Sequence, residues 1–179
     1  MDAFVQAAIL GAASHHGIDP NLLYGLVMVE SGGDTYAWNP EPKYRYFWNV
    51  RRSEPFRPVT RNEVTSKIPP IDFPFLAGDR DQEWWAQQAS WGLMQVMGAV
   101  AREHGFTGRY LTQLLEPGVG LEHGCRVLSS LLKWSGGNVE QALASYNGGR
   151  GGNSAPPYRN AAYAKKVIDA QKTLSGKSA

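Results

Sequence analysis

The sequence has few of the features that stabilise or anchor a chain other than a hydrophobic core. It holds one cysteine, Cys125, so no disulfide can form within the chain, and we predict a buried structural thiol. No apolar run approaches the length of a membrane span. The apolar stretch 3–13 follows Asp2, and the first Lys or Arg is Lys43, so it does not read as a secretory signal.

Charge and metal-ligand patterns are equally sparse. Lys plus Arg number 18 against 16 Asp plus Glu, and this net charge of +2 is too small and scattered to predict nucleic-acid binding. It suits an anionic polymer such as a cell wall. The four histidines lack zinc-ligand spacing, and neither a nucleophile elbow nor a phosphate loop occurs. We therefore expect no metal and no cofactor.

What is present predicts a mainly helical single domain over residues 1–179. Asp2 and Asp19-Pro20 are typical of helix starts, and Gly17 and Ser31-Gly32-Gly33 of helix ends, so helices are expected over 2–16 and 20–30. Between 38 and 88 prolines predict an irregular lobe, with a short strand or hairpin where Tyr44, Tyr46 and Trp48 alternate. Further helices are expected at 83–88, 93–104, 110–115, 117–134, 138–144 and 160–174, with a mobile glycine-rich loop at 147–153.

Four short motifs follow one another in the chain: Glu30-Ser31, Gly92-Leu93-Met94-Gln95, Ala144-Ser145-Tyr146-Asn147-Gly148-Gly149, and Tyr163 to Val167. In type and order they resemble the motifs of the lytic transglycosylases, which share the goose-type lysozyme fold. The resemblance implies an α+β lysozyme-like fold, a helical core with an inserted irregular, β-containing lobe at about 38–88. The lobe and Gly98, where the family often has proline, are departures that touch no motif residue.

Glu30 is the expected catalytic residue on physical grounds as well. Glycoside cleavage needs an acid that stays protonated near neutral pH and lies close to the leaving oxygen. Glu30 falls in the last turn of an apolar helix, where the helix dipole disfavours a negative charge. Val27 and Val29, together with Met94 and Met97 if the motifs converge, would add apolar surroundings that also favour the neutral form.

The resemblance implies further residues that contact substrate. The expected substrate-binding set is Ser31, Met94, Gln95, Tyr146, Asn147, Tyr163, Tyr46 and Trp91. Amides such as Gln95 and Asn147 suit sugar hydroxyls and N-acetyl groups, although such residues are also common in solvated turns. One tyrosine hydroxyl is expected to reach Glu30, and we choose Tyr146. Five aromatic residues either line a saccharide groove or, in several cases, form the lobe's small core: Trp38, Tyr44, Tyr46, Trp48 and Trp91.

The expected function is peptidoglycan cleavage between N-acetylmuramic acid and N-acetylglucosamine, with 1,6-anhydro products. One alternative is a goose-type muramidase that uses water with Asp79, Asp81 or Glu83 as a second carboxylate; another is a wall-binding module that does not cut. The expected partner is the glycan strand, with no nucleic acid and no membrane insertion, and the protein is expected to be a monomer. Action on the bacterial cell wall without a signal peptide fits a phage lysin, a virion-borne enzyme or a processed form.

Overall fold

The computed structural model describes residues 1–76 and 78–175, and the chain forms two compact units. Unit 1 combines Met1–Asp34 with the chain from Gly124 onward, and unit 2 comprises Thr35–His123. Helix α6 (Pro117–Trp134) begins in unit 2 and ends in unit 1. Unit 2 thus contains the predicted lobe and also the Gly-Leu-Met-Gln turn that follows it.

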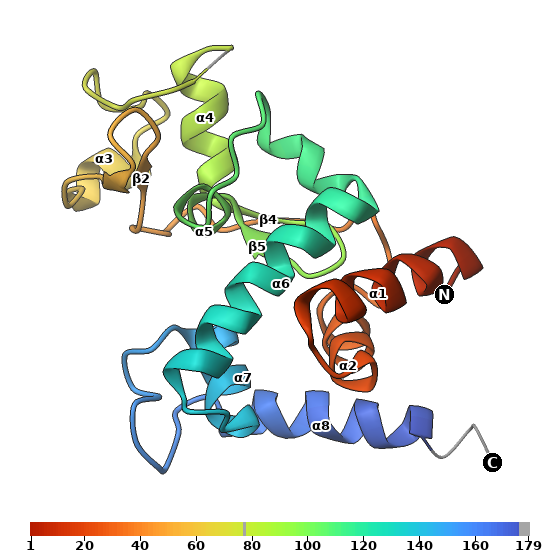
Figure 1. Cartoon of the computed structure of the whole chain (residues 1–179). Coiled ribbons are helices and arrows are strands. Elements are labelled where there is room, and N and C mark those ends of the chain that lie inside the picture. The colour runs from red at the N-terminus through yellow and green to blue at the C-terminus, as the bar shows by residue number, and fades with distance from the viewer. Residues whose placement is uncertain (77, 176–179) are drawn as a thin grey trace. The chain divides into compact units, whose positions relative to one another are not determined.

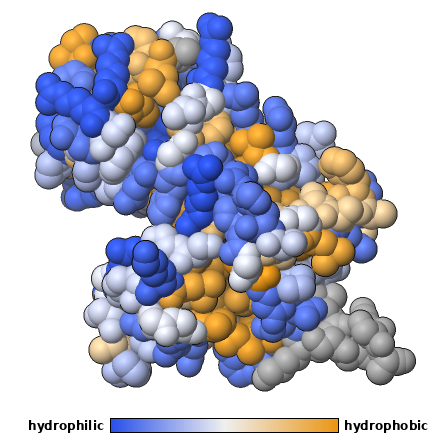
Figure 2. Space-filling model, viewed as in Figure 1, coloured by the Kyte–Doolittle hydropathy of each residue, from blue (hydrophilic) through white to orange (hydrophobic). Residues whose placement is uncertain are grey.

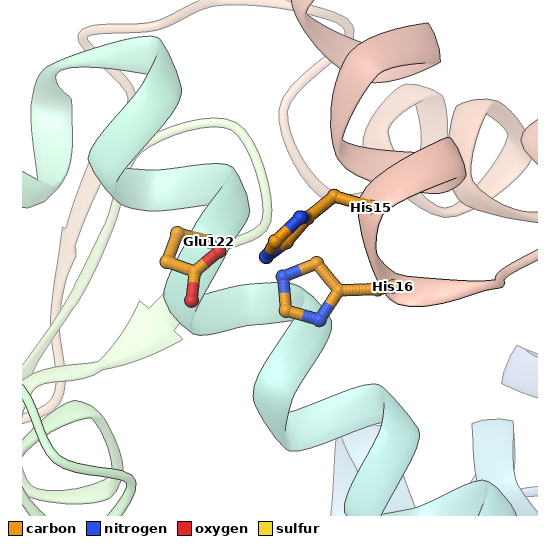
Figure 3. A group of neighbouring side chains, drawn as sticks. All are labelled: His15, His16 and Glu122. Carbon is orange, nitrogen blue, oxygen red and sulfur yellow. The ribbon is translucent and has the colours of Figure 1, made fainter.

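Unit 1 is helical, and its first two helices begin and end where local signals predict. Helix α1 (Ala3–His16) is capped by the Asp2 carboxylate, which accepts a hydrogen bond from the amide of Phe4 (2.9 Å), and it ends at the left-handed Gly17. The rings of His15 and His16 meet edge to face in its last turn, with centroids 4.9 Å apart (Figure 3). Helix α2 (Pro20–Glu30) starts after Asp19, whose side chain accepts from the Asn21 amide (2.8 Å).

The core of unit 1 lies where α2 packs against α8 (Ala161–Ser175) and α8 packs against α7 (Val139–Gly148) (Figure 1). Buried apolar residues line these contacts: Leu23, Leu26, Val27, Leu143, Ala144, Ala164 and Val167. Cys125 is buried as well, which confirms the prediction of a structural thiol. Helix α2, which ends at Glu30, is therefore fixed by its packing against α8, which α7 supports in turn.

Unit 2 holds the strands. A three-stranded antiparallel sheet has the order β1 (Trp38–Pro40), β4 (Ala89–Trp91), β5 (Val96–Met97), with Trp38 opposite Trp91. A second pair joins β2 (Trp48–Asn49) to β3 (Glu54–Pro55). The helices of this unit are short: α3 (Arg61–Thr65), α4 (Arg80–Gln87), α5 (Gly98–Glu103) and the 3-10 turn η1 (Leu111–Leu115).

Unit 2 has its own aromatic core. Phe47 stacks on Trp84 with ring centroids 4.1 Å apart, and Phe73 meets both rings edge-on. Val59 and Val64 complete the cluster. None of the aromatic residues proposed from the sequence for a saccharide groove belongs to this cluster, so other aromatic residues stabilise the lobe.

A buried ion pair stabilises the same unit. Arg102 of α5 donates two hydrogen bonds to the Glu83 carboxylate of α4 (2.8 and 2.7 Å) and two to the carbonyl oxygens of Phe106 and Gly108. Gln87 donates a further bond to Glu83 (2.9 Å). With every strong donor partnered, the pair avoids the cost of an isolated buried charge.

Three expectations were wrong in detail. The helix expected from 93 begins only at Gly98, because Gly92 and Gln95 have φ of 68° and 46° and the chain between them turns into β5. Of the alternating aromatic residues at 44–48, only Trp48 lies in a strand, and this strand, β2, forms an antiparallel hairpin with β3. The predicted 147–153 loop is also shorter, since α7 continues through Gly148.

The predicted fold class is confirmed, because the described chain is mostly helical with a small sheet. Within the described residues no helix combines the length and apolarity needed to cross a membrane. The surface mixes polar and apolar areas (Figure 2). Ile68 and Ile71, on the loop between α3 and α4, are large aliphatic side chains that lie mostly exposed on it.

Candidate active site

Glu30 is the last residue of α2, and a tyrosine from a distant part of the chain holds it. The hydroxyl of Tyr163, in the first turn of α8, donates a hydrogen bond to Oε1 of Glu30. Burial raises the pKa of Glu30 above its ordinary value, and the hydrogen bond from Tyr163 lowers it by a smaller amount. Glu30 thus has the raised pKa that a general acid needs, together with a donor that stabilises its ionised form.

The close approach of two helices makes this pair possible. A Cβ at Gly25 of α2 would lie 2.9 Å from the carbonyl oxygen of Val167 and 3.0 Å from the amide nitrogen of Gln171. Only glycine therefore lets α2 approach the backbone of α8 so closely. Tyr163 and Val167 are four residues apart on one face of α8, so the buried Val167 and the Glu30-binding Tyr163 point the same way.

Tyr146 occupies a different position from the one predicted. It was chosen as the tyrosine bonded to Glu30, and the structure assigns that bond to Tyr163 instead. Tyr146 nevertheless lies in the same environment, because burial and the nearby charge of Glu30 both raise its pKa. Sequence spacing alone could not separate the two tyrosines, since the choice depends on how α7 and α8 pack.

Ser31 closes the helix next to Glu30. Its hydroxyl donates to the carbonyl oxygen of Val27 (3.2 Å) and accepts from the amide of Gly33 (3.2 Å). The second bond gives the amide of Gly33, just past the helix, a partner, and the Val27 carbonyl oxygen also accepts from the amide of Ser31 (3.0 Å). Ser31 thereby helps to fix the backbone at Glu30, and direct contact with substrate stays a prediction.

Asn147 is bonded to Asn160, which Asn153 holds in turn, and the sequence analysis singled out neither of these two asparagines. Asn160 donates to the side-chain oxygen of Asn147 (2.7 Å). Asn153 is fully buried, donates to the carbonyl oxygens of Ala144 and Gly149, and accepts from the amide of Asn160 (3.0 Å). The glycine-rich loop is therefore tied to the end of α7 and the start of α8. The one signal available in the sequence was the position of Asn153, a polar residue next to the glycines of this loop.

Gln95, in unit 2, uses its side chain within the turn that it shapes. Its amide nitrogen donates to the carbonyl oxygens of Ala37 and Gly92 (3.0 Å each), and its oxygen accepts from the hydroxyl of Ser90 (2.8 Å). Both amide hydrogens are thereby engaged, and the left-handed backbone of Gln95 is supported. The adjacent Met94 is fully buried. Sugar contacts by either residue remain predictions.

Tyr46 and Trp91, the two remaining candidates, also lie in unit 2. The hydroxyl of Tyr46 is hydrogen-bonded to Glu103, and burial together with this carboxylate raises the pKa of Tyr46. The indole of Trp91 donates to the carbonyl oxygen of Ala86 (2.9 Å), and the ring lines a cavity of unit 2.

Three carboxylates were expected as candidates for a water-using mechanism, and two of them, Asp79 and Glu83, have structural partners. Asp79 caps α4 by accepting from the amide of Gln82 (2.7 Å). Glu83 is buried in the ion pair with Arg102. Asp81 is exposed in the first turn of α4, a position that favours an acidic side chain at a helix start.

The chain is thus mainly helical with a small sheet, and it carries a partly buried, tyrosine-bonded acid at the end of a helix, which is consistent with a lysozyme-like α+β fold. The family described as the transglycosylase SLT domain matches residues 7–168, so the chain belongs to this family and the resemblance read from the motifs is confirmed. The fold is also similar to the X-ray structure of an inactive mutant of lytic transglycosylase Slt from Pseudomonas aeruginosa, with a TM-score of 0.61 at 17% identity. The match covers 96% of this chain and 24% of that protein.

Proposed function

We propose that this domain cleaves the β-1,4 bond between N-acetylmuramic acid and N-acetylglucosamine in peptidoglycan and releases 1,6-anhydro-muramic ends. The Glu30–Tyr163 pair is the observation that carries the proposal, because it provides one carboxyl group with a raised pKa and a fixed orientation. Family membership supports peptidoglycan as the substrate. The site of action would be the bacterial cell wall.

In the proposed mechanism Glu30 acts twice. Its proton passes to the leaving oxygen of N-acetylglucosamine as the bond from that oxygen to the anomeric carbon breaks. The muramic 6-hydroxyl oxygen then bonds to the anomeric carbon, and its proton returns to the Glu30 carboxylate. No water is consumed, and the acid is regenerated. Because the 6-hydroxyl belongs to the same sugar, it reacts at a high effective concentration.

Tyr163 has a defined part in this cycle. Its hydrogen bond stabilises Glu30 in the ionised form that exists between the two proton transfers. A hydrolase on the same fold would need a second carboxylate to activate water. The roles of Asp79 and Glu83 in unit 2, as helix cap and ion-pair partner, weigh against these two residues in that role.

Digestion of purified peptidoglycan with the wild-type chain and with Glu30→Gln tests the proposal. The wild type should release soluble muropeptides that are one water lighter than muramidase products and lack a new reducing end. Glu30→Gln should lower turnover by at least ~10²–10⁴-fold, the usual contribution of a general acid. The related Slt structure carries a glutamate-to-glutamine change in its inactive mutant. Mainly reducing muramic ends would favour the hydrolase, and activity within a few-fold of wild type in Glu30→Gln would remove Glu30 from the mechanism.

A further inference from the structure

Unit 2 contains a cavity that three tryptophans and a tyrosine help to line. Its volume is about 400 Å³, within the range of small-ligand sites. Trp38 of β1, Trp91 of β4 and Trp85 of α4 line it, as does Tyr110, which precedes η1. A second hollow of about 310 Å³ is lined by Trp38 and Trp85 again, together with Pro40 and Pro42. Because both hollows share these two tryptophans, we refer to them together as the Trp38–Trp85 groove.

The rings of this groove are available to a ligand. Trp38, Trp85 and Tyr110 are 56%, 39% and 38% exposed, unusually high values for large aromatic side chains. Trp84, the neighbour of Trp85, is fully buried in the core of unit 2. The core thus fixes α4 with Trp85 turned outward.

The remaining wall is rigid. The rings of Trp38 and Trp91 lie 6.1 Å apart at an angle of 40°, and the indole of Trp91 is fixed to α4 by its bond to Ala86. Along β4 side chains alternate between faces, and Ser90 holds Gln95. Trp91 therefore points to the sheet face opposite Ser90, so the groove is not formed by the Gly-Leu-Met-Gln turn.

Polar groups at the edge of the cavity indicate what kind of ligand would fit. Glu83 lines the cavity, but its charge is balanced by the two bonds from Arg102. Arg109 is exposed and lies over the Tyr110 ring at 5.2 Å, leaving a positive charge at this end. The side chains of Gln82 and Thr112 add neutral hydrogen-bonding groups. Glu41, in the second hollow, accepts from Asn39 (2.7 Å).

We propose that the Trp38–Trp85 groove is a saccharide-binding site for an N-acetylhexosamine ring with a carboxylate-bearing substituent. The apolar faces of the sugar would pack on the tryptophans, as they do on aromatic rings in glycan sites, and the carboxylate would lie at Arg109. The ligand class rests on the proposed function, since the lactyl group of a muramic acid unit is a free carboxylate wherever that unit carries no peptide stem. Unit 2 would thereby hold the glycan through residues that none of the motifs supplies.

Binding measured without cleavage tests this site. The full chain with Glu30→Gln is titrated with chitotetraose, and with a disaccharide of N-acetylglucosamine and N-acetylmuramic acid, while the indole N–H signals are followed by NMR. The signals of Trp38, Trp85 and Trp91 should shift. Adding Trp85→Ala, and separately Trp38→Ala, should weaken both ligands at least about fivefold, the loss expected for a residue central to binding. Trp134→Ala, in unit 1, is the matched control and should change neither affinity.

Arg109→Gln separates the two parts of the proposal. It should weaken the muramic disaccharide and leave chitotetraose unchanged. Unchanged affinity in both Trp85→Ala and Trp38→Ala, with melting temperatures equal to that of the parent, would overturn the site. Equal losses for both ligands in Arg109→Gln would overturn the carboxylate assignment. Failure of the proposed function is distinguishable from failure of this site. In that case the wild-type chain would release no muropeptides, even if the titrations showed that Trp85 binds sugar.

Discussion

Gly25 of α2 lies directly against the backbone of Val167 in α8, where a Cβ would be 2.9 Å from the carbonyl oxygen. Backbone atoms cannot rotate away as the end of a side chain can, so a larger residue must push the two helices apart. Tyr163 lies on the same face of α8, one helical turn before Val167. The separation of the helices and the Glu30–Tyr163 bond are thereby coupled.

Gly25→Ala is therefore expected to lower the free energy of unfolding by about 1–3 kcal/mol, the usual cost of overpacking, and to reduce muropeptide release as well. Gly11→Ala is a matched control in α1, because a Cβ there has no neighbour within 4 Å. That change should be neutral or stabilise the helix by up to about 1 kcal/mol. Equal stability and activity in the two variants would show that the close contact does not matter.

Tyr163→Phe should change the pH dependence of cleavage as well as its rate. The lost hydrogen bond lowers the pKa of Glu30 in the wild type, so the pKa of Glu30 should rise further in the variant. An acid with a higher pKa stays protonated to higher pH, and the alkaline limb of kcat/KM should move to higher pH. The rate at the optimum should fall by less than in Glu30→Gln.

Tyr146→Phe is the comparison for this measurement, because it keeps the Tyr163 bond. Its alkaline limb should move less than that of Tyr163→Phe. A limb that stays in place in Tyr163→Phe, or moves to lower pH, would contradict the role given to Tyr163.

Local signals in the sequence predicted the helices around Glu30 well, whereas packing decided the rest. Asp2, Gly17 and Asp19 act on backbone groups within a few residues, so the bounds of α1 and α2 could be read directly. The partner of Glu30 lies 133 residues away, and the choice between Tyr146 and Tyr163 depends on how α7 and α8 meet. Gln95 was predicted to bind sugar because it is an amide residue within a motif of the resemblance. In the structure its amide nitrogen donates to the carbonyl oxygen of Ala37, a residue that only the folded sheet brings near.

Asn153 illustrates the same limit and gives a further prediction. It is fully buried and makes bonds to the end of α7, to Gly149 and to Asn160. Asn153→Ala leaves buried polar groups without partners and should cost about 1–3 kcal/mol of unfolding free energy. Activity should fall as well, because Asn160 then loses its fixed position beside Asn147.

Asn21→Ala is the control, because Asn21 is an exposed residue near the start of α2, and this change should have a small effect. A similarly small effect in Asn153→Ala would mean that the loop is held by other contacts.

Glu30→Gln should stabilise the fold in a pH-dependent way. Burial raises the pKa of Glu30 in the folded protein, so between its ordinary value and this raised value the folded chain binds more protons than the unfolded chain. The free energy of unfolding of the wild type must then fall as pH rises through that interval. The glutamine side chain of the variant does not titrate, so the stability gained by Glu30→Gln should grow with rising pH and level off above the folded pKa. Urea unfolding between pH 4 and pH 8 measures the difference.

Glu140→Gln is the control for this measurement. It removes an exposed carboxylate from the first turn of α7, where negative charge favours the helix, so its stability should gain nothing as pH rises. A constant difference between Glu30→Gln and wild type across this range would mean that Glu30 has no raised pKa and that its suitability as a general acid must come from the substrate.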